Sequence, residues 1–309
     1  MDDNSHSSCI LDRIIRYRQI VQGILEAIFV TERYLPVNSA ARVLLFSLVY
    51  TFIQILLEYV RTNQTSMLSA LSDSVAGIFL GAVLGLLFAQ LPFMRAIRIG
   101  VAWLALFIVQ EFSNLVEGYF FTTYLPTMSL FFAASFIGLM VTFIEALLVG
   151  FLFVPKKVVM SFTKEVRAYL RERSWHSWIP RILAGSAVYF PIYFVFGALI
   201  SPFVMPYYLE PSMGLRIPTF AVMIPLEFVR GFLYVIALLP MIAVLTVQRK
   251  YVFAGTASLL YVAGAFVPFL SGPGLPVQLR IFHGLEILAD CLVYGAALAY
   301  LFAPKRAPT

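Results

Sequence analysis

Charged residues are scarce in this sequence. Asp, Glu, Lys and Arg together make up 12% of the 309 residues, whereas hydrophobic residues make up 61% and the mean hydropathy is +0.89. A soluble domain of ordinary composition carries roughly a quarter charged residues. A single domain has too little interior to keep this much apolar surface away from water. The composition therefore excludes an ordinary soluble protein and predicts an integral membrane protein.

Cysteine and histidine are also rare. The two cysteines, Cys9 and Cys291, lie far apart in the sequence and give no basis for a disulfide framework or a thiolate metal site. Of the three histidines, only His283 falls in an apolar run, so a pair of axial ligands for an intramembrane haem is missing. A phosphate-cradling glycine loop and a nucleophile elbow are missing as well. The sequence predicts no cofactor and leaves open whether a metal ion binds.

Long apolar runs fill most of the chain. A helix needs about 20 apolar residues to cross the hydrocarbon core of a bilayer. Eight runs meet this requirement, which predicts an all-α integral membrane protein with eight transmembrane helices. The runs are residues 41–60, 74–93, 100–121, 129–153, 181–203, 217–246, 251–270 and 280–302.

Positive charge is distributed unevenly between the connecting segments. Alternate segments, beginning with the one before the first run, carry 18 of the 22 Lys and Arg residues, and the remaining loops carry only Arg61, Arg216 and Arg280. The positive-inside rule then predicts a multi-pass protein of the plasma or inner membrane with both termini in the cytoplasm. The net charge of +6 is explained by this inner surface, and it predicts contact with anionic lipid rather than with nucleic acid.

Two further segments have a helical period but do not span. Residues 10–30 and 156–173 place apolar residues at three- and four-residue spacing, with basic residues on the opposite face. Such amphipathic helices lie in the membrane interface. The alternative is a cytoplasmic helix that packs on the rest of the protein.

The sequence repeats itself. "RVLLFSLVYTFI" at 42–53 matches "RILAGSAVYFPI" at 181–192, with Arg, Leu, Ser, Val, Tyr and Ile at the same spacing. "LLFAQLP", which ends at Pro92, matches "YVIALLP", which ends at Pro240, and each proline is expected to end or kink its span. "GFLFVPKK" after the fourth run matches "AYLFAPKR" after the eighth.

These matches predict a duplication. The first repeat would be residues 1–157 and the second residues 158–309, each with one interfacial helix followed by four spans. Since each repeat has an even number of spans, both enter the membrane in the same orientation. The two four-helix repeats would then be parallel, related by a twofold axis along the membrane normal, with a cleft between them.

Polar side chains interrupt three of the apolar runs. An ionisable group within a span costs at least ~2.5–3.5 kcal/mol, so it is expected to face other protein groups or water rather than lipid. Spacing of three or four residues places the groups of each run on one face of its helix, and we expect the three faces to meet in one substrate- or ion-binding site. The candidates are Glu111, Asn114 and Glu117 in the third run, Glu227 and Arg230 in the sixth, and His283, Glu286 and Asp290 in the eighth.

This set holds five carboxylates against one arginine and one histidine. Such an excess implies water access, protonated carboxyl groups or a bound cation, with Arg230 as counter-ion. The equivalent stretch of the seventh run, "LLYVAGAFVPF", has no charge. The predicted repeats therefore differ in their polar groups, which indicates one specialised site.

The segment "LEFVRGFL" at 226–233 resembles the glutamate–arginine motif of the CAAX-protease-like intramembrane family over about eight residues. That family has paired glutamates, an arginine four residues after the second, and histidines on later helices. This chain has one glutamate, an arginine three residues later, and only His283 thereafter. The family's catalytic residues are therefore not assigned to this sequence.

Three functions remain open. The first is a transporter or channel-like protein for a proton, a cation or a small cationic solute, with its site between the repeats. The second is a membrane scaffold or lipid-interaction protein in which the polar groups only fix helix packing. The third is an intramembrane metal-dependent enzyme that uses His283, Glu286 and Glu117 as ligands, although a single histidine is a poor basis for a zinc site.

Overall fold

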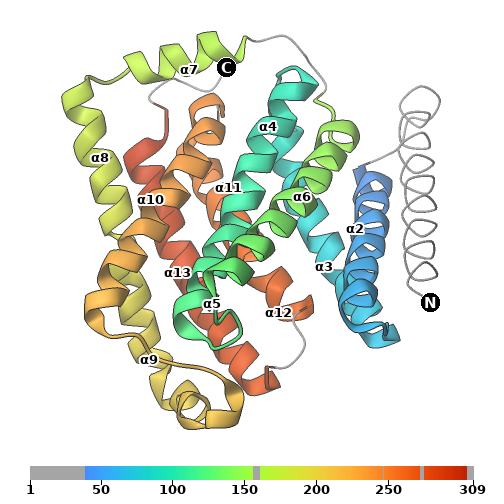
Figure 1. The fold of residues 1–309 in the computed structure, drawn as a ribbon. Coiled ribbons are helices and arrows are strands. Elements are labelled where there is room, and N and C mark those ends of the chain that lie inside the picture. Colours follow the sequence, from blue (N-terminus) through green and yellow to red (C-terminus); the bar gives the residue numbers. More distant parts are fainter. Residues whose placement is uncertain (1–38, 156–160, 246, 272–274, 305–309) are drawn as a thin grey trace, which may run out of the picture.

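The computed structural model describes residues 39–155, 161–245, 247–271 and 275–304 (Figure 1). Regular structure within these ranges is helical, apart from one isolated bridge between Thr122 and Leu215. Eight helices are long and apolar enough to cross a membrane, which confirms the predicted all-α fold with eight spans. They cover Ser39–Thr62, Met67–Phe88, Arg95–Phe121, Met128–Leu152, Trp175–Leu209, Phe220–Val244, Arg249–Leu270 and Val277–Phe302.

Five of the spans are single α-helices. They are α2 (Ser39–Thr62), α3 (Met67–Phe88), α6 (Met128–Leu152), α10 (Phe220–Val244) and α13 (Val277–Phe302). The second span begins earlier than residue 74 because Ser66 caps it, its side chain accepting a hydrogen bond from the backbone N–H of Ser69.

Two spans contain a π-helical turn at mid-length. The third consists of α4 (Arg95–Leu106), the π-helix η1 (Phe107–Phe112) and α5 (Ser113–Phe121). The seventh consists of α11 (Arg249–Tyr261), the π-helix η3 (Val262–Phe266) and α12 (Val267–Ser271). π-helical turns are rare and occur mostly at functional sites.

The fifth span is broken at Val188, between α8 (Trp175–Ala187) and α9 (Tyr189–Leu209). Pro191 explains the break, because proline has no N–H to donate to the carbonyl of Ala187 one turn before it. The two matched prolines of the second and sixth spans behave differently from each other. α3 ends at Phe88, so that Pro92 lies in the turn after it, whereas Pro240 lies inside α10.

The contacts between helices follow one scheme in each half of the chain. In the first half, α2 packs against α3 and α6, and α4 packs against α6. In the second half, α8 packs against α10, and α9 and α11 pack against α13. Between the halves, α3 contacts α11 and α12, α10 contacts α4, and η1 contacts η3. The two π-helical turns thus meet in the interior of the bundle.

Arginine side chains tie the helices together at one end of the bundle. Arg42 Nη1 donates to the carbonyl of Leu152 at 2.9 Å, and Arg181 Nη1 donates to the carbonyl of Leu301 at 2.8 Å. Each bond satisfies a carbonyl in the last turn of a helix, which has no partner within that helix.

The short helix α7 (Phe162–Arg171) lies across the same end of the bundle (Figure 1). Its buried Tyr169 donates a hydrogen bond to the carbonyl of Phe302 at 2.6 Å, and Arg173 just beyond the helix donates to the carbonyl of Ala303 at 2.9 Å. The basic segment expected at 156–173 is thus helical over 162–171, with one side packed on protein. The other predicted interfacial helix, residues 10–30, lies outside the described residues.

Candidate functional site

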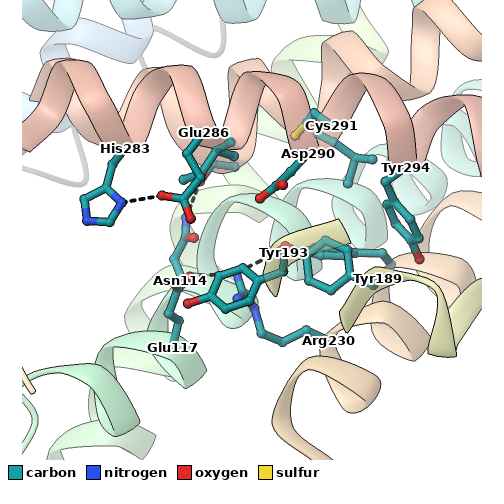
Figure 2. Close-up of a pocket in the computed structure, with 14 residues that line it drawn as sticks. Asn114, Glu117, Tyr189, Tyr193, Arg230, His283, Glu286, Asp290, Cys291 and Tyr294 are labelled. Carbon is teal, nitrogen blue, oxygen red and sulfur yellow. Dashed lines mark hydrogen bonds and ion pairs between the residues drawn. The ribbon is translucent and has the colours of Figure 1, made fainter. Parts of the chain in front are cut away.

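A small cavity lies between the two halves of the chain, bounded by α5, α9, α10, η3 and α13 (Figure 2). Its volume is about 40 Å³. A single water needs roughly 10–15 Å³ on this measure, so the cavity has room for a few water molecules or a small ion. Six of the eight residues predicted for the site line this cavity: Asn114, Glu117, Arg230, His283, Glu286 and Asp290.

Arg230 joins two carboxylates that come from different helices. Its Nη2 lies 2.6 Å from Glu117 Oε2 on α5, and its Nη1 lies 2.9 Å from Glu227 Oε2 on α10. The guanidinium is also 5.6 Å from the ring centre of Tyr189, close enough for a cation–π interaction. Because Glu227 is fully buried and Arg230 is 4% exposed, this ion pair is almost completely removed from solvent.

His283 and Glu286 form the second ion pair of the cavity. His283 Nδ1 is 2.7 Å from Glu286 Oε2, one turn along α13. The imidazole ring stacks on Phe269 and lies edge-on to Tyr208, which hold it in place. The other oxygen of Glu286 faces Gly197 of α9, where an added Cβ would lie 3.0 Å from it. Gly197 thus leaves space for this carboxylate.

Asp290 differs from the other acidic residues of the cavity. It is 1% exposed, and among the described residues neither of its carboxylate oxygens has a hydrogen-bond partner. Figure 2 shows its carboxylate pointing from α13 into the space beside Tyr193 and Tyr189. Leaving a buried polar group without a partner costs about 1–3 kcal/mol, and more when the group is charged. Such a side chain is stabilised by a proton, by water or by a bound ligand.

Asn114 connects the two π-helical turns. Its Nδ2 donates to the carbonyl of Gln110 at 2.8 Å and to the carbonyl of Gly264 in η3 at 2.9 Å. A π-helical turn leaves backbone carbonyls without their usual α-helical partner, and a side-chain amide can supply one. Asn114 therefore links the two halves of the chain beside the cavity.

Two predicted residues do not line this cavity. Glu227 lies behind Arg230, as its ion-pair partner. Glu111 faces Gly138 of α6 and lines a second cavity on the other side of η1. Asn114 lines both cavities, so the three residues expected on one face are divided between two cavities. Glu111 lies within the π-helical turn at 107–112, which departs from the α-helical spacing that the expectation assumed.

Tyrosines form the part of the site that sequence reasoning missed. Tyr189, Tyr193, Tyr234 and Tyr294 line the cavity together with Cys291. A signal was present in the sequence, because Tyr234 follows Arg230, and Tyr294 follows Asp290, at the four-residue spacing that shares a helix face. Tyr294 donates its hydroxyl toward the carbonyls of Gly185 and Gly231, each 3.0 Å away, and so fixes one wall of the cavity.

The charges in and behind this cavity do not balance. Four carboxylates, those of Glu117, Glu227, Glu286 and Asp290, face the guanidinium of Arg230 and the imidazole of His283. The arrangement attracts protons and small cations. Within the described part of the chain, however, no three His, Cys, Asp or Glu side chains form a group that could hold a metal ion.

We compared the chain with protein-family models, with curated proteins and with solved structures. No family model, no curated protein and no solved structure matches it.

Proposed function

We propose that this protein is a multi-pass transporter that moves a proton or another small cation through the cavity between its two halves. The observation that carries the proposal is Asp290, whose two buried carboxylate oxygens have no partner among the residues that the structure describes and lie in a cavity that can hold water. Asp290 takes up and releases the ion. Ionisable groups inside a membrane protein typically mark such proton and ion pathways.

The neighbours of Asp290 suit this role. Glu286 lies one turn before it on α13 and is paired with His283, which leads toward the end of that helix. Arg230 holds Glu117 and Glu227, so its positive charge is already matched and cannot pair with Asp290 as well. His283 and Glu286 would connect Asp290 to the solvent, and the Arg230 pairs would hold α5 and α10 in position.

The proposed site lies between two repeats, residues 1–157 and 158–309. Matched contacts support the duplication. Arg42 and Arg181, aligned in the sequence, donate to Leu152 and Leu301, which are also aligned. The third and seventh spans each begin with an arginine and carry a π-helical turn, which starts 12 residues after Arg95 (at Phe107) and 13 residues after Arg249 (at Val262).

Glycines of the second and sixth spans support the same duplication. An added Cβ at Gly77 would press on Ser47 and Tyr50, and one at Gly231 would press on Ser186 and Tyr189. Ser47 and Tyr50 align with Ser186 and Tyr189 in the repeated segment. In this alignment of the two proposed repeats, Gly77 is equivalent to Gly231. Pro92 and Pro240, which the sequence match aligned, are then not equivalent.

A parallel duplication also accounts for the membrane orientation that we propose, with both termini in the cytoplasm. The end of the bundle that carries Arg42, Arg181 and α7 is rich in Lys and Arg, and anionic lipid would contact it. The cavity then lies nearer the outer face, because Glu117 precedes, and His283 follows, a loop at the opposite end of the bundle.

Infrared difference spectroscopy of the reconstituted protein tests the role of Asp290 without knowledge of any co-substrate. We expect the C=O stretching band of a protonated carboxylic acid to appear and disappear as the pH is changed. The Asp290→Asn variant should lack that band, and Glu210→Gln, a change at an exposed residue outside the cavity, should keep it. A spectrum that is the same in wild type and Asp290→Asn would contradict the proposal.

Proton flux into liposomes is the second measurement. Vesicles that contain the protein and an internal pH dye should acidify faster than protein-free vesicles when a potential is imposed, and Asp290→Asn should reduce the rate to that of protein-free vesicles. If the infrared band and the flux are both independent of Asp290, the polar groups only fix helix packing, and the scaffold function is the better description.

A further inference from the structure

A second cavity lies on the other side of η1, bounded by α2, α3, α5, α6, η1 and α12, and it shares Asn114 with the first. Its volume is about 740 Å³, much larger than the 40 Å³ of the first. Three carboxylates line it, those of Glu58, Asp73 and Glu111, together with one arginine, Arg61. Its charged groups therefore carry an excess of negative charge.

The second cavity occupies the place to which the proposed twofold axis would carry the first. The sequence offset that relates Arg42 to Arg181 also relates Tyr50 and Gln54 of the second cavity to Tyr189 and Tyr193 of the first. The offset that relates Leu152 to Leu301 likewise relates Ile137 and Val141 to Glu286 and Asp290. The two cavities are thus formed by equivalent faces of equivalent helices.

The wall that α13 contributes to the first cavity differs in chemistry from the wall that α6 contributes to the second. α13 presents His283, Glu286 and Asp290 to the first cavity, whereas α6 presents Ala134, Ile137 and Val141 at the equivalent positions. All three side chains of α6 are apolar, and Ala134 is smaller than its counterpart His283. The carboxylates of the second cavity come instead from the other walls, namely α2, α3 and η1.

Two buried polar atoms of this cavity have no hydrogen-bond partner in the part of the chain that the structure describes. Gln110 is 4% exposed, and its Nε2 donates to both oxygens of Glu145, but its Oε1 has no hydrogen bond. Glu58 Oε1 accepts from Ser69 Oγ at 2.9 Å, while Oε2 is buried without a partner. An acceptor that is buried without a donor costs about 1–3 kcal/mol. A cation bound beside these oxygens would offset part of that cost, because each oxygen carries negative charge.

We propose that this second cavity binds an amphipathic organic monocation. Its volume lies within the range of roughly 300–1,000 Å³ that is typical of small-molecule sites, and it exceeds what a bare ion would fill. Leu57, Ile137 and Val141 offer apolar walls, and the ring of Tyr50 can face an organic cation. Glu58 and Glu111 attract the positive charge. The site is separate from Asp290, so it does not depend on the proposed ion pathway.

Equilibrium binding of radiolabelled tetraphenylphosphonium to the full chain in lipid nanodiscs tests the proposal. We expect saturable binding that tetraphenylborate, an anion of the same shape, does not compete for. Neutralising one carboxylate, in Glu111→Gln or Glu58→Gln, should weaken binding by about tenfold, which corresponds to about 1.4 kcal/mol. Asp290→Asn should leave binding unchanged, which separates this proposal from the ion pathway.

A matched pair of tryptophan variants tests the location. Ala134 lines the cavity, whereas the adjacent Ala133 is exposed and does not line it. Ala134→Trp should abolish binding because it fills the cavity, and Ala133→Trp should bind as wild type does. Equal binding in the two tryptophan variants, or equal competition by tetraphenylborate, would overturn the proposal. Unchanged binding in both carboxylate variants would overturn it as well.

Discussion

Arg230 on α10 and Glu117 on α5 are joined by a 2.6 Å ion pair that crosses from the second half of the chain to the first. The same guanidinium holds the fully buried Glu227 of its own helix. One arginine therefore stabilises a carboxylate in the interior and connects the two halves beside the cavity.

We predict that Arg230→Met destabilises the protein strongly, because the substitution leaves Glu227 buried without a counter-ion. Removal of one partner of a buried ion pair typically costs about 3–5 kcal/mol. The measurement is thermal or denaturant unfolding in detergent, with Arg171→Met, at an exposed residue of α7, as a reference. The double variant Arg230→Met/Glu227→Leu should recover much of the loss. If the double variant is no more stable than Arg230→Met, the buried charge is not the cause.

Asp290→Val is predicted to raise stability, in the direction opposite to Arg230→Met. The substitution removes two buried oxygens that have no partner, and Val141 occupies the equivalent position in the proposed first repeat. The expected gain is about 1–3 kcal/mol, the usual cost of an unsatisfied buried polar group. Functional sites often store such instability. A marked decrease in the melting temperature would instead show that Asp290 is needed for folding.

Gly231→Ala should disrupt the contact between α10 and the fifth span. An added methyl group would overlap the carbonyl oxygen of Ser186 and press on Tyr189. Overpacking of this kind costs about 1–3 kcal/mol. The control is Gly100→Ala in α4, where an added Cβ has no atom within 4 Å and the higher helix propensity of alanine should stabilise by up to about 1 kcal/mol. Unfolding measurements that rank the two variants in the reverse order would contradict the packing described for Gly231.

The matched arginines Arg42 and Arg181 should contribute similarly to stability. Each donates to a carbonyl in the last turn of a span, and a hydrogen bond from a charged group is worth about 1.5–3 kcal/mol. Arg42→Met and Arg181→Met should each lower the free energy of unfolding by an amount in this range. Their effects should add in the double variant, because the two arginines donate to carbonyls of different helices, α6 and α13. If only one of the two variants loses stability, the hydrogen bonds of Arg42 and Arg181 are not energetically equivalent.

The sequence predicted most of the fold because the bilayer imposes a simple requirement. Each span must satisfy its backbone hydrogen bonds internally and bury about 20 apolar residues, so composition alone located all eight spans, most of them within a few residues. The sequence placed the beginning of the second span at residue 74 instead of Met67, because the first turns of this helix are polar and Ser66 was not recognised as its cap. The matched segments around Arg42 and Arg181 could also be recognised from the sequence, because each is a short motif near the beginning of a span.

The sequence also located six of the fourteen residues that line the first cavity. His283, Glu286 and Asp290 share one face of an uninterrupted helix, so their spacing predicted their common direction. Glu117 and Arg230 were identified because charged groups at membrane depth need a partner.

Only the tertiary structure decided where Glu111 points and which tyrosines surround Asp290. The π-helical turn at 107–112 breaks the regular phase of the third span, and its position depends on contacts with η3 rather than on local propensity. The second cavity depends likewise on side chains from α2, α3, α6 and α12, which no single segment brings together. Hydropathy and spacing act along one helix and could be read from the sequence, whereas cavities arise from the packing between helices.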